Sequence, residues 1–367
     1  MDPEELGAWL RLLEAPGLGR ESARKLLAAF GSPQAVLAAS AAAIREVAGP
    51  AASTALTTGS PTVEALIQTT VAWLAAETDV PRSVIALGDP RFPAALLHAA
   101  DPPLLFYTQG NTALLGGQCL AVVGSRNPTH QGTDNARAFS ATLSQAGLTI
   151  VSGLALGIDA AAHEGGLEGA ASTIAVVGTG LDRVYPKRHL ALAHRIAQNG
   201  LIVSEYSLGT PALPPHFPNR NRIIAGLARG TLVVEAALKS GSLITARLAS
   251  ESGRDVFAIP GSIHSPQSRG CHALIKQGAK LVETAQDILE EFQPAEAAKK
   301  SATPQGALDL DEDPVLAALG FDPATLDALV ARTDWSAAAL SVHLLELELS
   351  GRIARLPGQL FQRIGSA

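Results

Sequence analysis

Basic side chains gather in one short segment of the sequence, Phe217–Arg222 (FPNRNR). Arg220 and Arg222 flank Asn221 there, and Lys239 follows in a Lys-Ser-Gly-Ser turn. Guanidinium and ammonium groups bind phosphate oxygens through charge-assisted hydrogen bonds. Backbone N–H groups at the start of a helix also favour an anion. These residue types therefore predict a site for phosphate groups.

The Lys-Ser-Gly-Ser turn lies between an expected strand and an expected helix. Thr231–Ala236 (TLVVEA) is short and β-branched, which predicts a buried strand. We expect Leu243–Glu251 to be a helix that Ser242 caps, and Asp255–Ile259 to be a second strand. Together these elements form a βαβ unit of a parallel sheet. Such sheets bind ligands at the carboxyl ends of their strands, where this turn would lie.

The same pattern occurs several times upstream. Strands are expected at Cys119–Val123, Thr149–Ser152, Ser172–Val177 and Leu201–Ser204, with helices between them. The series predicts an α/β fold with an extended, Rossmann-like, doubly wound sheet. Glycine-rich turns follow the first three strands and would bring N–H donors to one edge of the sheet. They contain Gly124, Ser125, Arg126, Gly153, Gly178 and Gly180.

The rest of the chain divides by composition into smaller parts. Residues 1–79 have a helical pattern, either as a helix-hairpin-helix element that contacts DNA or as a bundle that only packs. Residues 80–292 hold the sheet, and 293–313 have the composition of a linker. Residues 314–367 give three helices and a hairpin, which describes a winged helix. Its third helix is acidic, which favours packing or protein contact over DNA contact.

Composition limits the possible classes of protein. A length of 367 residues predicts two or three domains. The segment Met1–Arg11 lacks the pattern of an export signal, and no apolar run is long enough for a membrane span. Cys119 and Cys271 are far apart and unsuited to a disulfide framework or a zinc site. We therefore expect a cytoplasmic protein without a membrane or metal partner.

The glycine turns do not match a dinucleotide site. Such a site needs G-x-G-x-x-G and an acidic residue about 20 positions further on. After Gly124 that position falls near Ser144, and after Gly178 it falls near Gln198; neither residue is acidic. The sequence also lacks the Gly-Lys-Ser/Thr of a Walker A motif. We expect no cofactor.

Two carboxylates are candidates for acid–base chemistry. Glu205 and Glu235 lie at or near strand ends, so either could serve an enzyme of the N-glycosidase type that acts on a nucleotide. Either could instead hold the guanidinium of Arg126, Arg220 or Arg222. The sequence leaves both interpretations open.

Asp159 and His163 are four positions apart on an expected helix, next to Ser152. This spacing invites a Ser-His-Asp triad, but no G-x-S-x-G nucleophile elbow exists in the sequence. Asp159 is better placed to cap its own helix. We therefore expect no catalytic residue here.

Aromatic residues make up only 4% of the chain. Tyr185, Tyr206 and Phe217 are the few near the glycine-rich edge. A groove with few stacking platforms should hold the backbone of a nucleic acid more than its bases, and so be largely insensitive to sequence. Repeated phosphate sites favour a strand of DNA over a single nucleotide.

Several segments together resemble the bacterial DNA-processing protein A (DprA/Smf) family. They are Val122–Arg126 (VVGSR), Val151–His163 (VSGLALGIDAAAH), Ile174–Pro186 (IAVVGTGLDRVYP), Phe217–Leu227 (FPNRNRIIAGL), Val233–Ala246 (VVEAALKSGSLITA) and Val256–Gly261 (VFAIPG). The resemblance covers roughly residues 80–292. The tail is similar to the family's winged-helix domain, and the helical start to its variable SAM-like or helix-hairpin-helix domain.

The resemblance implies a non-enzymatic protein that binds single-stranded DNA, forms a homodimer and helps load the RecA recombinase during uptake of transforming DNA. The family's DNA pocket corresponds here to Gly124, Ser125, Arg126, Phe217, Arg220, Asn221, Arg222, Lys239, Ser240, Gly241 and Ser242. Gly153, Gly178, Gly180 and Lys187 complete the expected DNA-binding residues. Leu156 stands where the family more often has a basic residue, and we expect Lys187 and Arg188 to compensate.

Overall fold

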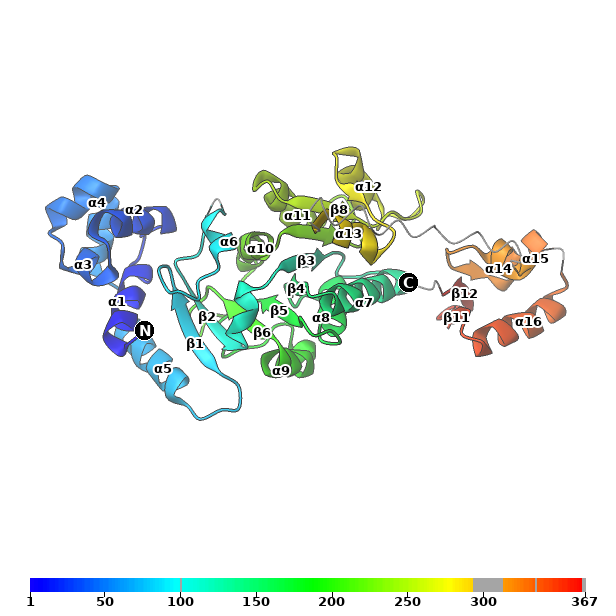
Figure 1. The fold of residues 1–367 in the computed structure, drawn as a ribbon, viewed down its shortest axis with the longest axis horizontal. Coiled ribbons are helices and arrows are strands. Elements are labelled where there is room, and N and C mark those ends of the chain that lie inside the picture. The colour runs from blue at the N-terminus through cyan, green and yellow to red at the C-terminus, as the bar shows by residue number, and fades with distance from the viewer. Residues whose placement is uncertain (100, 293–312, 334, 365–367) are drawn as a thin grey trace. The chain divides into compact units, whose positions relative to one another are not determined.

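A sheet of nine strands, in the order β1-β2-β6-β5-β4-β3-β7-β8-β9, organises the larger part of the chain (Figure 1). The computed structural model describes residues 1–99, 101–292, 313–333 and 335–364. It has two compact units, Met1–Ala285 and Gln286–Ala367, and the sheet belongs to the first.

The strands of this sheet are mostly parallel. Strands β3 to β9 pair in parallel, whereas β1 pairs with β2, and β2 with β6, in antiparallel fashion. Their bounds are β1 (Arg82–Ala86), β2 (Leu105–Gly110), β3 (Cys119–Val123), β4 (Thr149–Ser152), β5 (Thr173–Val176), β6 (Leu201–Ser204), β7 (Gly230–Val233), β8 (Asp255–Ala258) and β9 (Lys280–Leu281). The predicted doubly wound α/β sheet is confirmed.

The central strands are buried along their whole length. Every residue of β3, β4, β5, β6 and β7 is buried, because helices cover both faces of the sheet. Val123, Val151 and Val176 from three neighbouring strands share one hydrophobic cluster. Short β-branched runs without alternation are the sequence pattern of such strands, and β3, β4 and β6 have the predicted bounds.

Helices of the first unit cover opposite faces of the sheet in two groups. The helices that connect β3 through β6 are α7 (His130–Gln145), α8 (Ile158–Gly166) and α9 (Leu190–Asn199), the last preceded by the 3₁₀ turn η2 (Lys187–His189). Figure 1 shows them on the face opposite α10 (His216–Leu227), α11 (Ser242–Glu251) and α12 (Arg269–Lys276). The short α6 (Ala94–Leu97) and η1 (Thr112–Gly116) flank β2.

The strand order reverses between β3 and β7. From β3 the chain proceeds outward through β4, β5 and β6 on one side, and later through β7, β8 and β9 on the other. The connections that follow β3 and β7 therefore run to opposite faces, which leaves a crevice between them at the carboxyl ends of these strands. This point of the sheet is where the fold itself places a ligand.

Helices at the start of the chain pack on the antiparallel edge of the same sheet. They are α1 (Pro3–Leu13), α2 (Arg20–Phe30), α3 (Pro33–Ala38), α4 (Ala41–Thr58) and α5 (Val63–Ala75). Leu10 and Leu26 share a cluster with Val84 and Tyr107 of β1 and β2. Arg24 forms a 2.7 Å salt bridge with Asp101. Apolar burial and ion pairs both hold these helices against the sheet, as expected for a helical element that packs.

The second unit begins within α13 (Ala285–Phe292) and contains a winged helix, as predicted. Its elements are α14 (Pro314–Leu319), β10 (Ala324–Thr325), α15 (Leu326–Thr333), α16 (Ala337–Leu349), β11 (Ile353–Leu356) and β12 (Leu360–Arg363). The two residues of β10 pair with β12, so they add a third strand to the predicted hairpin, and α15 begins directly after them at Leu326. The expected linker, 293–313, lies outside the described residues except for Asp313, which caps α14.

Within the described parts of the chain, none of the helices combines the length and the hydropathy that crossing a bilayer requires.

Candidate nucleic-acid interface

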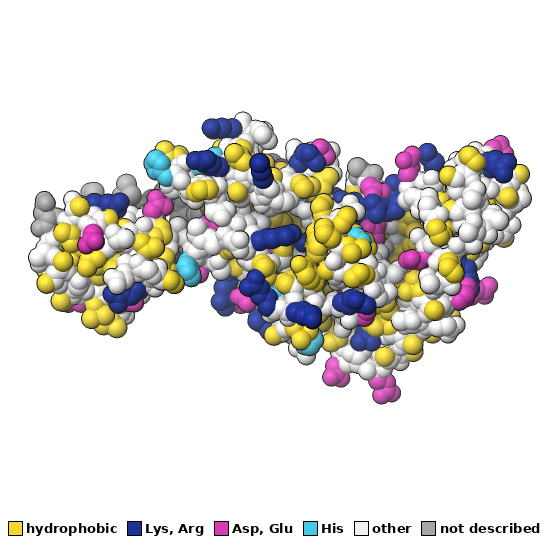
Figure 2. All heavy atoms as spheres, turned by 180° about the vertical axis from the view of Figure 1, so that it is seen from behind, with side chains coloured by type: hydrophobic (Ala, Val, Ile, Leu, Met, Phe, Trp, Pro, Cys, Tyr) yellow, Lys and Arg dark blue, Asp and Glu magenta, His cyan; other side chains and the backbone are white. Residues whose placement is uncertain are grey.

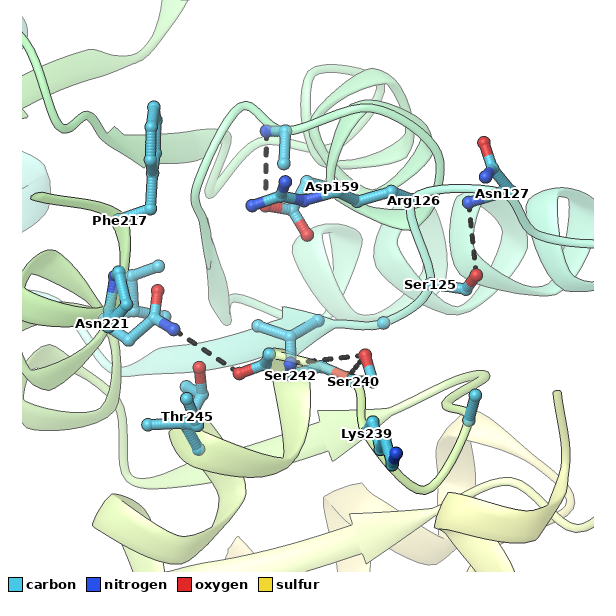
Figure 3. A pocket seen from close by; sticks show the side chains of 18 of the residues that line it. Ser125, Arg126, Asn127, Asp159, Phe217, Asn221, Lys239, Ser240, Ser242 and Thr245 are labelled. Atoms are coloured by element: carbon cyan, nitrogen blue, oxygen red, sulfur yellow. Dashed lines mark hydrogen bonds between the residues drawn. The ribbon is translucent and has the colours of Figure 1, made fainter. Parts of the chain in front are cut away.

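A cavity of about 500 Å³ occupies the crevice between the ends of β3 and β7. Three segments contribute most of its wall: the loop after β3, the first turns of α10 and the turn that leads into α11 (Figure 3). Its lining includes Gly124, Ser125, Arg126, Asn127, Asp159, Phe217, Arg220, Asn221, Lys239, Ser240, Gly241, Ser242, Thr245 and Gln267. The structure thus brings together most of the residues that the sequence indicated.

The loop after β3 is held by its own backbone. A Cβ atom at Gly124 would lie 2.7 Å from Cγ1 of Ile158 and 2.9 Å from the carbonyl oxygen of Glu235, so only glycine fits. The carbonyl oxygen of Ser125 accepts a hydrogen bond from the N–H of Ile158 at 3.1 Å. Because the backbone is fixed in this way, the Arg126 side chain projects into the cavity from a rigid base (Figure 3).

The start of α10 supplies an aromatic wall. The guanidinium carbon of Arg126 lies 5.9 Å from the ring centroid of Phe217, within reach of a cation–π contact. Tyr185 lies next to the same ring, with 5.4 Å between centroids. His216 fixes the first turn, because its Nδ1 donates to the carbonyl oxygen of Gly178 at 3.1 Å and its ring stacks on Tyr206.

The turn before α11 forms the opposite wall. Ser240 and Ser242 join their hydroxyl groups at 2.7 Å, and Nδ2 of Asn221 reaches the carbonyl oxygen of Gly241 at 3.5 Å. The prediction that Ser242 caps the helix is wrong, because Gly241 holds the cap position and Ser242 is the first helical residue. Lys239 lies on this turn and lines the cavity.

Arg220 and Arg222 have partners within the protein. Arg220 is 4% exposed, and its Nη1 donates to the carbonyl oxygen of Val176 at 3.0 Å. Arg222 forms a 2.5 Å salt bridge with Glu205. Arg220 contributes to the floor of the cavity, whereas Arg222 does not line it. Of the two interpretations of Glu205, the structure supports the one in which its carboxylate holds an arginine, since it binds Arg222.

The loop after β4 is built by side chains of α8. Oδ2 of Asp159 accepts hydrogen bonds from the N–H groups of Gly153 and Ala155 at 3.1 and 3.2 Å. Nε2 of His163 accepts from the N–H of Leu154 at 3.2 Å. The prediction that Asp159 caps its own helix is wrong, because Gly157 holds the N-cap position and no side chain caps the helix. The N–H of Gly153 is consequently not available to a ligand.

Burial shifts the pKa values of His163 and Asp159, the two side chains that hold the loop after β4. It lowers the pKa of His163 to about 3, with the positive charges of Arg220 and His189 acting in the same direction. The imidazole is therefore neutral, which its role as acceptor from Leu154 requires. Burial also raises the pKa of the Asp159 carboxyl, while Arg220 opposes that rise. These groups support the loop rather than forming a triad with Ser152, whose hydroxyl donates to the carbonyl oxygen of Val122.

Three further residues of the expected set lie outside this cavity. Gly178 contacts the first turn of α10, and the N–H of Gly180 donates to the carbonyl oxygen of Thr210 at 3.1 Å. Lys187 is exposed on η2. Gly178 and Gly180 therefore position the aromatic wall, and they present no free edge to the cavity.

The second carboxylate candidate, Glu235, is also engaged. Its two carboxylate oxygens accept hydrogen bonds from the N–H and the hydroxyl of Thr129 at 2.9 and 2.5 Å. Thr129 is the N-cap residue of α7. A Cβ atom at Gly132 would lie 2.4 Å from this carboxylate, so a glycine is needed beside it. Neither Glu205 nor Glu235 lines the cavity.

Arg126 and Lys239 bring positive charge to the cavity, and the Asp159 carboxylate belongs to the same lining, where the charges of Arg220 and Arg126 act on it. Among the described residues, neither Arg126 nor Lys239 has a salt bridge within 4.0 Å. Figure 2 shows one face of the molecule, where several Lys and Arg side chains lie over the part that holds the sheet. Asn127 and Gln267 also line the cavity, where Nε2 of Gln267 donates to the carbonyl oxygen of Asn127 at 3.1 Å, and no sequence pattern indicated either residue.

Comparison with known proteins assigns this arrangement to a family. Residues 83–293 match the family model described as DNA recombination-mediator protein A, and residues 299–359 match the DprA winged helix domain. Protein Smf of Escherichia coli (strain K12) is 42% identical over 301 residues, which cover 80% of this chain and 79% of that protein. DNA processing protein DprA of Streptococcus pneumoniae is 51% identical over 205 residues, covering 56% and 72%.

Two solved structures share the fold. DNA processing protein A from Streptococcus pneumoniae superposes with a TM-score of 0.69 at 39% identity, covering 78% of this chain and 98% of that one. DNA processing protein A from Helicobacter pylori, described for its unique single-stranded DNA binding mode, gives 0.52 at 32% identity, covering 57% and 95%. With both family models and these relatives in agreement, the chain belongs to the DNA recombination-mediator protein A family, and the predicted resemblance is confirmed.

Proposed function

We propose that this protein binds single-stranded DNA in the cavity between β3 and β7, without catalysing a reaction on it. One observation carries the proposal: Arg126 and Lys239 line the cavity from opposite walls and lack a salt bridge to any described residue. Cations that form no salt bridge within the protein, placed at a ligand crevice, are suited to an anionic partner. The relative from Helicobacter pylori, which is described as binding single-stranded DNA, supports the choice of anion.

Each wall has its own role in this proposal. Arg126 and Lys239 bind phosphate oxygens, and the Ser240–Ser242 turn adds hydroxyl and N–H donors at the start of α11. Phe217 and Tyr185 offer ring faces on which bases stack. Phosphate contacts and stacking do not discriminate strongly between bases, so binding is expected to tolerate any sequence.

The aromatic wall favours a single strand over a duplex. Tyr185 is 51% exposed beside Phe217, so a ring face is open to solvent near the cavity. Only a base that has left its partner strand can lie on such a face. Duplex DNA would contact the cations alone.

The experiment is an anisotropy titration of the protein with labelled single-stranded and double-stranded oligonucleotides of the same sequence at two salt concentrations. We expect preference for the single strand and a steep loss of affinity with salt, because binding releases counterions from the phosphates. Preference for the duplex, or affinity that is independent of salt, would refute the proposal.

We further propose that the bound strand passes to the RecA recombinase during uptake of transforming DNA, inside the cytoplasm. The family description, a recombination mediator, supports this role. A strand-exchange assay with recombinase and a single-strand-binding competitor tests it. Stimulation by the wild-type protein and not by Arg126→Ala is expected; equal stimulation by both would contradict the link to this cavity.

We also propose a homodimer whose contact includes the edge strand β9. Leu281 is 44% exposed there, next to α12, and a short edge strand with an apolar side chain is suited to contact with another chain. Light scattering after size exclusion measures the mass directly. Leu281→Glu should lower it to that of a monomer, whereas a monomeric wild-type protein would rule the dimer out.

In the described part of the chain, the two carboxylate candidates do not support the alternative of a nucleotide-processing enzyme. Glu205 binds Arg222, and Glu235 binds Thr129 at the start of α7, so neither carboxylate is placed in the cavity to transfer a proton. Turnover of any nucleotide that Glu205→Gln or Glu235→Gln abolishes would revive it.

A further inference from the structure

A second cavity of about 410 Å³ adjoins the first. The two share Arg126 and Asn127 as common wall residues. The second is otherwise lined by the start of α7, the loop before α8 and the residues Arg188 and His189 of η2. Lys239 lines only the first cavity and Arg188 only the second, so Arg126 and Asn127 lie where the two cavities meet.

Positive charge dominates this second cavity. Arg126 and Arg188 line it together with His130, and none of the described lining residues is acidic. Arg188 is exposed and makes no salt bridge within the described chain. The carboxylate of Glu235, which follows β7, lies at the start of α7 and accepts hydrogen bonds from Thr129. Because Glu235 already occupies that helix start, the attraction for an anion comes from the arginines and not from the helix dipole.

The two cavities are fixed relative to each other by a close backbone contact. Gly157 has a φ of +78°, and a Cβ atom there would lie 2.4 Å from the carbonyl oxygen of Ser125 and 2.6 Å from Cδ of Pro128. The next residue, Ile158, donates its N–H to the same oxygen at 3.1 Å. The loop that carries Arg126 is thus locked to the loop that borders the second cavity. A ligand that spans both does not have to order either loop.

We propose that the second cavity binds a further phosphate of the same single strand, which leaves the first cavity across Arg126 and ends against Arg188. This inference rests on the proposed function. It adds the path that the strand takes across the protein and a second subsite for a phosphate. The chemistry is the same at both positions, since a guanidinium binds phosphate oxygens through paired N–H donors. The strand is chosen over a small free anion because the two cavities are contiguous.

A strand that spans two cavities makes a length-dependent prediction. An oligothymidylate of about 4 nucleotides fills one cavity, whereas one of about 20 nucleotides reaches both. Arg188→Ala should weaken the longer oligonucleotide about fivefold and reduce the slope of log K against log salt by about 0.7, the value for one phosphate contact with a single strand. The shorter oligonucleotide should change less than about twofold.

Arg195→Ala is the matched control. Arg195 is equally exposed, lies on the following helix α9 and lines neither cavity, so it removes the same charge at another place. It should leave both oligonucleotides unaffected. Circular dichroism confirms that both variants fold.

The outcomes separate the inference from the proposed function. If Arg188→Ala lowers the affinity for the short and the long oligonucleotide equally, or lowers neither affinity, the second subsite is refuted. Single-strand binding by the first cavity then still stands. If Arg195→Ala has the same effect as Arg188→Ala, the loss reflects net charge and the subsite is refuted. If the wild-type protein binds neither oligonucleotide, the proposed function itself fails. Inorganic phosphate that competes with the short and long oligonucleotides equally would also count against a path across both cavities.

Discussion

A Cβ atom at Gly153 would lie 1.3 Å from Nη1 of Arg220. The missing side chain is therefore what leaves space for a buried guanidinium beneath the cavity. Arg220 uses that space to reach the carbonyl oxygen of Val176 and to approach Asp159, with 3.8 Å between Nη2 and Oδ2. Asp159 in turn holds the N–H of Gly153. The two residues therefore support the loops around the cavity.

Gly153→Ala should destabilise the protein by about 3 kcal/mol or more. The new methyl group displaces Arg220 and leaves the buried Asp159 without its positive neighbour, and loss of one partner of a buried pair is strongly destabilising. Urea unfolding measures the change. Gly116→Ala is the control, because nothing lies within 4 Å of a Cβ atom there and its φ is not positive. Equal stability of the two variants would show that Arg220 relocates without penalty.

Arg126→Ala should reduce DNA affinity, whereas Arg222→Ala should reduce the stability of the fold. Arg126 has no salt bridge, so its loss should weaken single-stranded DNA binding for all sequences and change stability by less than about 0.5 kcal/mol. Arg222 pairs with Glu205 at 2.5 Å, and both side chains are 11% exposed, so its loss should reduce stability by about 3 kcal/mol. Anisotropy at a temperature where both variants are folded should show near wild-type affinity for Arg222→Ala. A reversed pattern would contradict the assignment of the two arginines.

Phe217→Leu should weaken binding without changing its salt dependence. The substitution keeps an apolar side chain beside Tyr185 and removes the ring face that a base stacks on, which is worth about 1–3 kcal/mol per base. The number of phosphate contacts stays the same, so the slope of log K against log salt should stay parallel to that of the wild type. Lys239→Ala provides the contrast, since it should lower that slope by about 0.7. An altered slope for Phe217→Leu would indicate that the ring acts by positioning Arg126.

The winged-helix unit should lose stability as the pH rises. Burial opposes the charged form of His343, but Asp313, whose Oδ2 lies 2.7 Å from Nε2, outweighs it and raises the pKa of His343 above its ordinary 6.5. A pKa that is higher in the folded state stabilises the fold below the unfolded value and loses this effect as pH passes the folded value. The melting temperature of this unit should therefore decrease between about pH 6 and about pH 8.

His343→Gln is the corresponding control for that pH dependence. The variant cannot take up the proton, so its melting temperature should be flat over the same interval, while Asp313 still caps α14. Proton NMR of the His343 ring measures the folded-state pKa directly. A value below 6.5, or an unchanged slope in the variant, would show that the ion pair does not stabilise the unit.

Much of the sheet follows from local sequence. The strands β3, β4 and β6 are short β-branched runs between glycine turns, and their bounds could be assigned because a fully buried strand leaves that pattern. The Gly124–Arg126 and Lys239–Ser242 turns could be placed at one edge because parallel strands end on the same side. The caps were less predictable: Ser242 and Asp159 both use their side chains for contacts other than the expected ones.

The fold, the family and most of the side chains that line the cavity follow from the sequence. Tertiary structure alone decided which of the arginines remain free. Arg220 and Arg222 lie in the same segment as Phe217, yet one is buried under Gly153 and the other binds Glu205, while Arg126 faces the cavity. Local sequence cannot distinguish them, because burial and charge pairing depend on residues that are brought close only when distant strands assemble into one sheet.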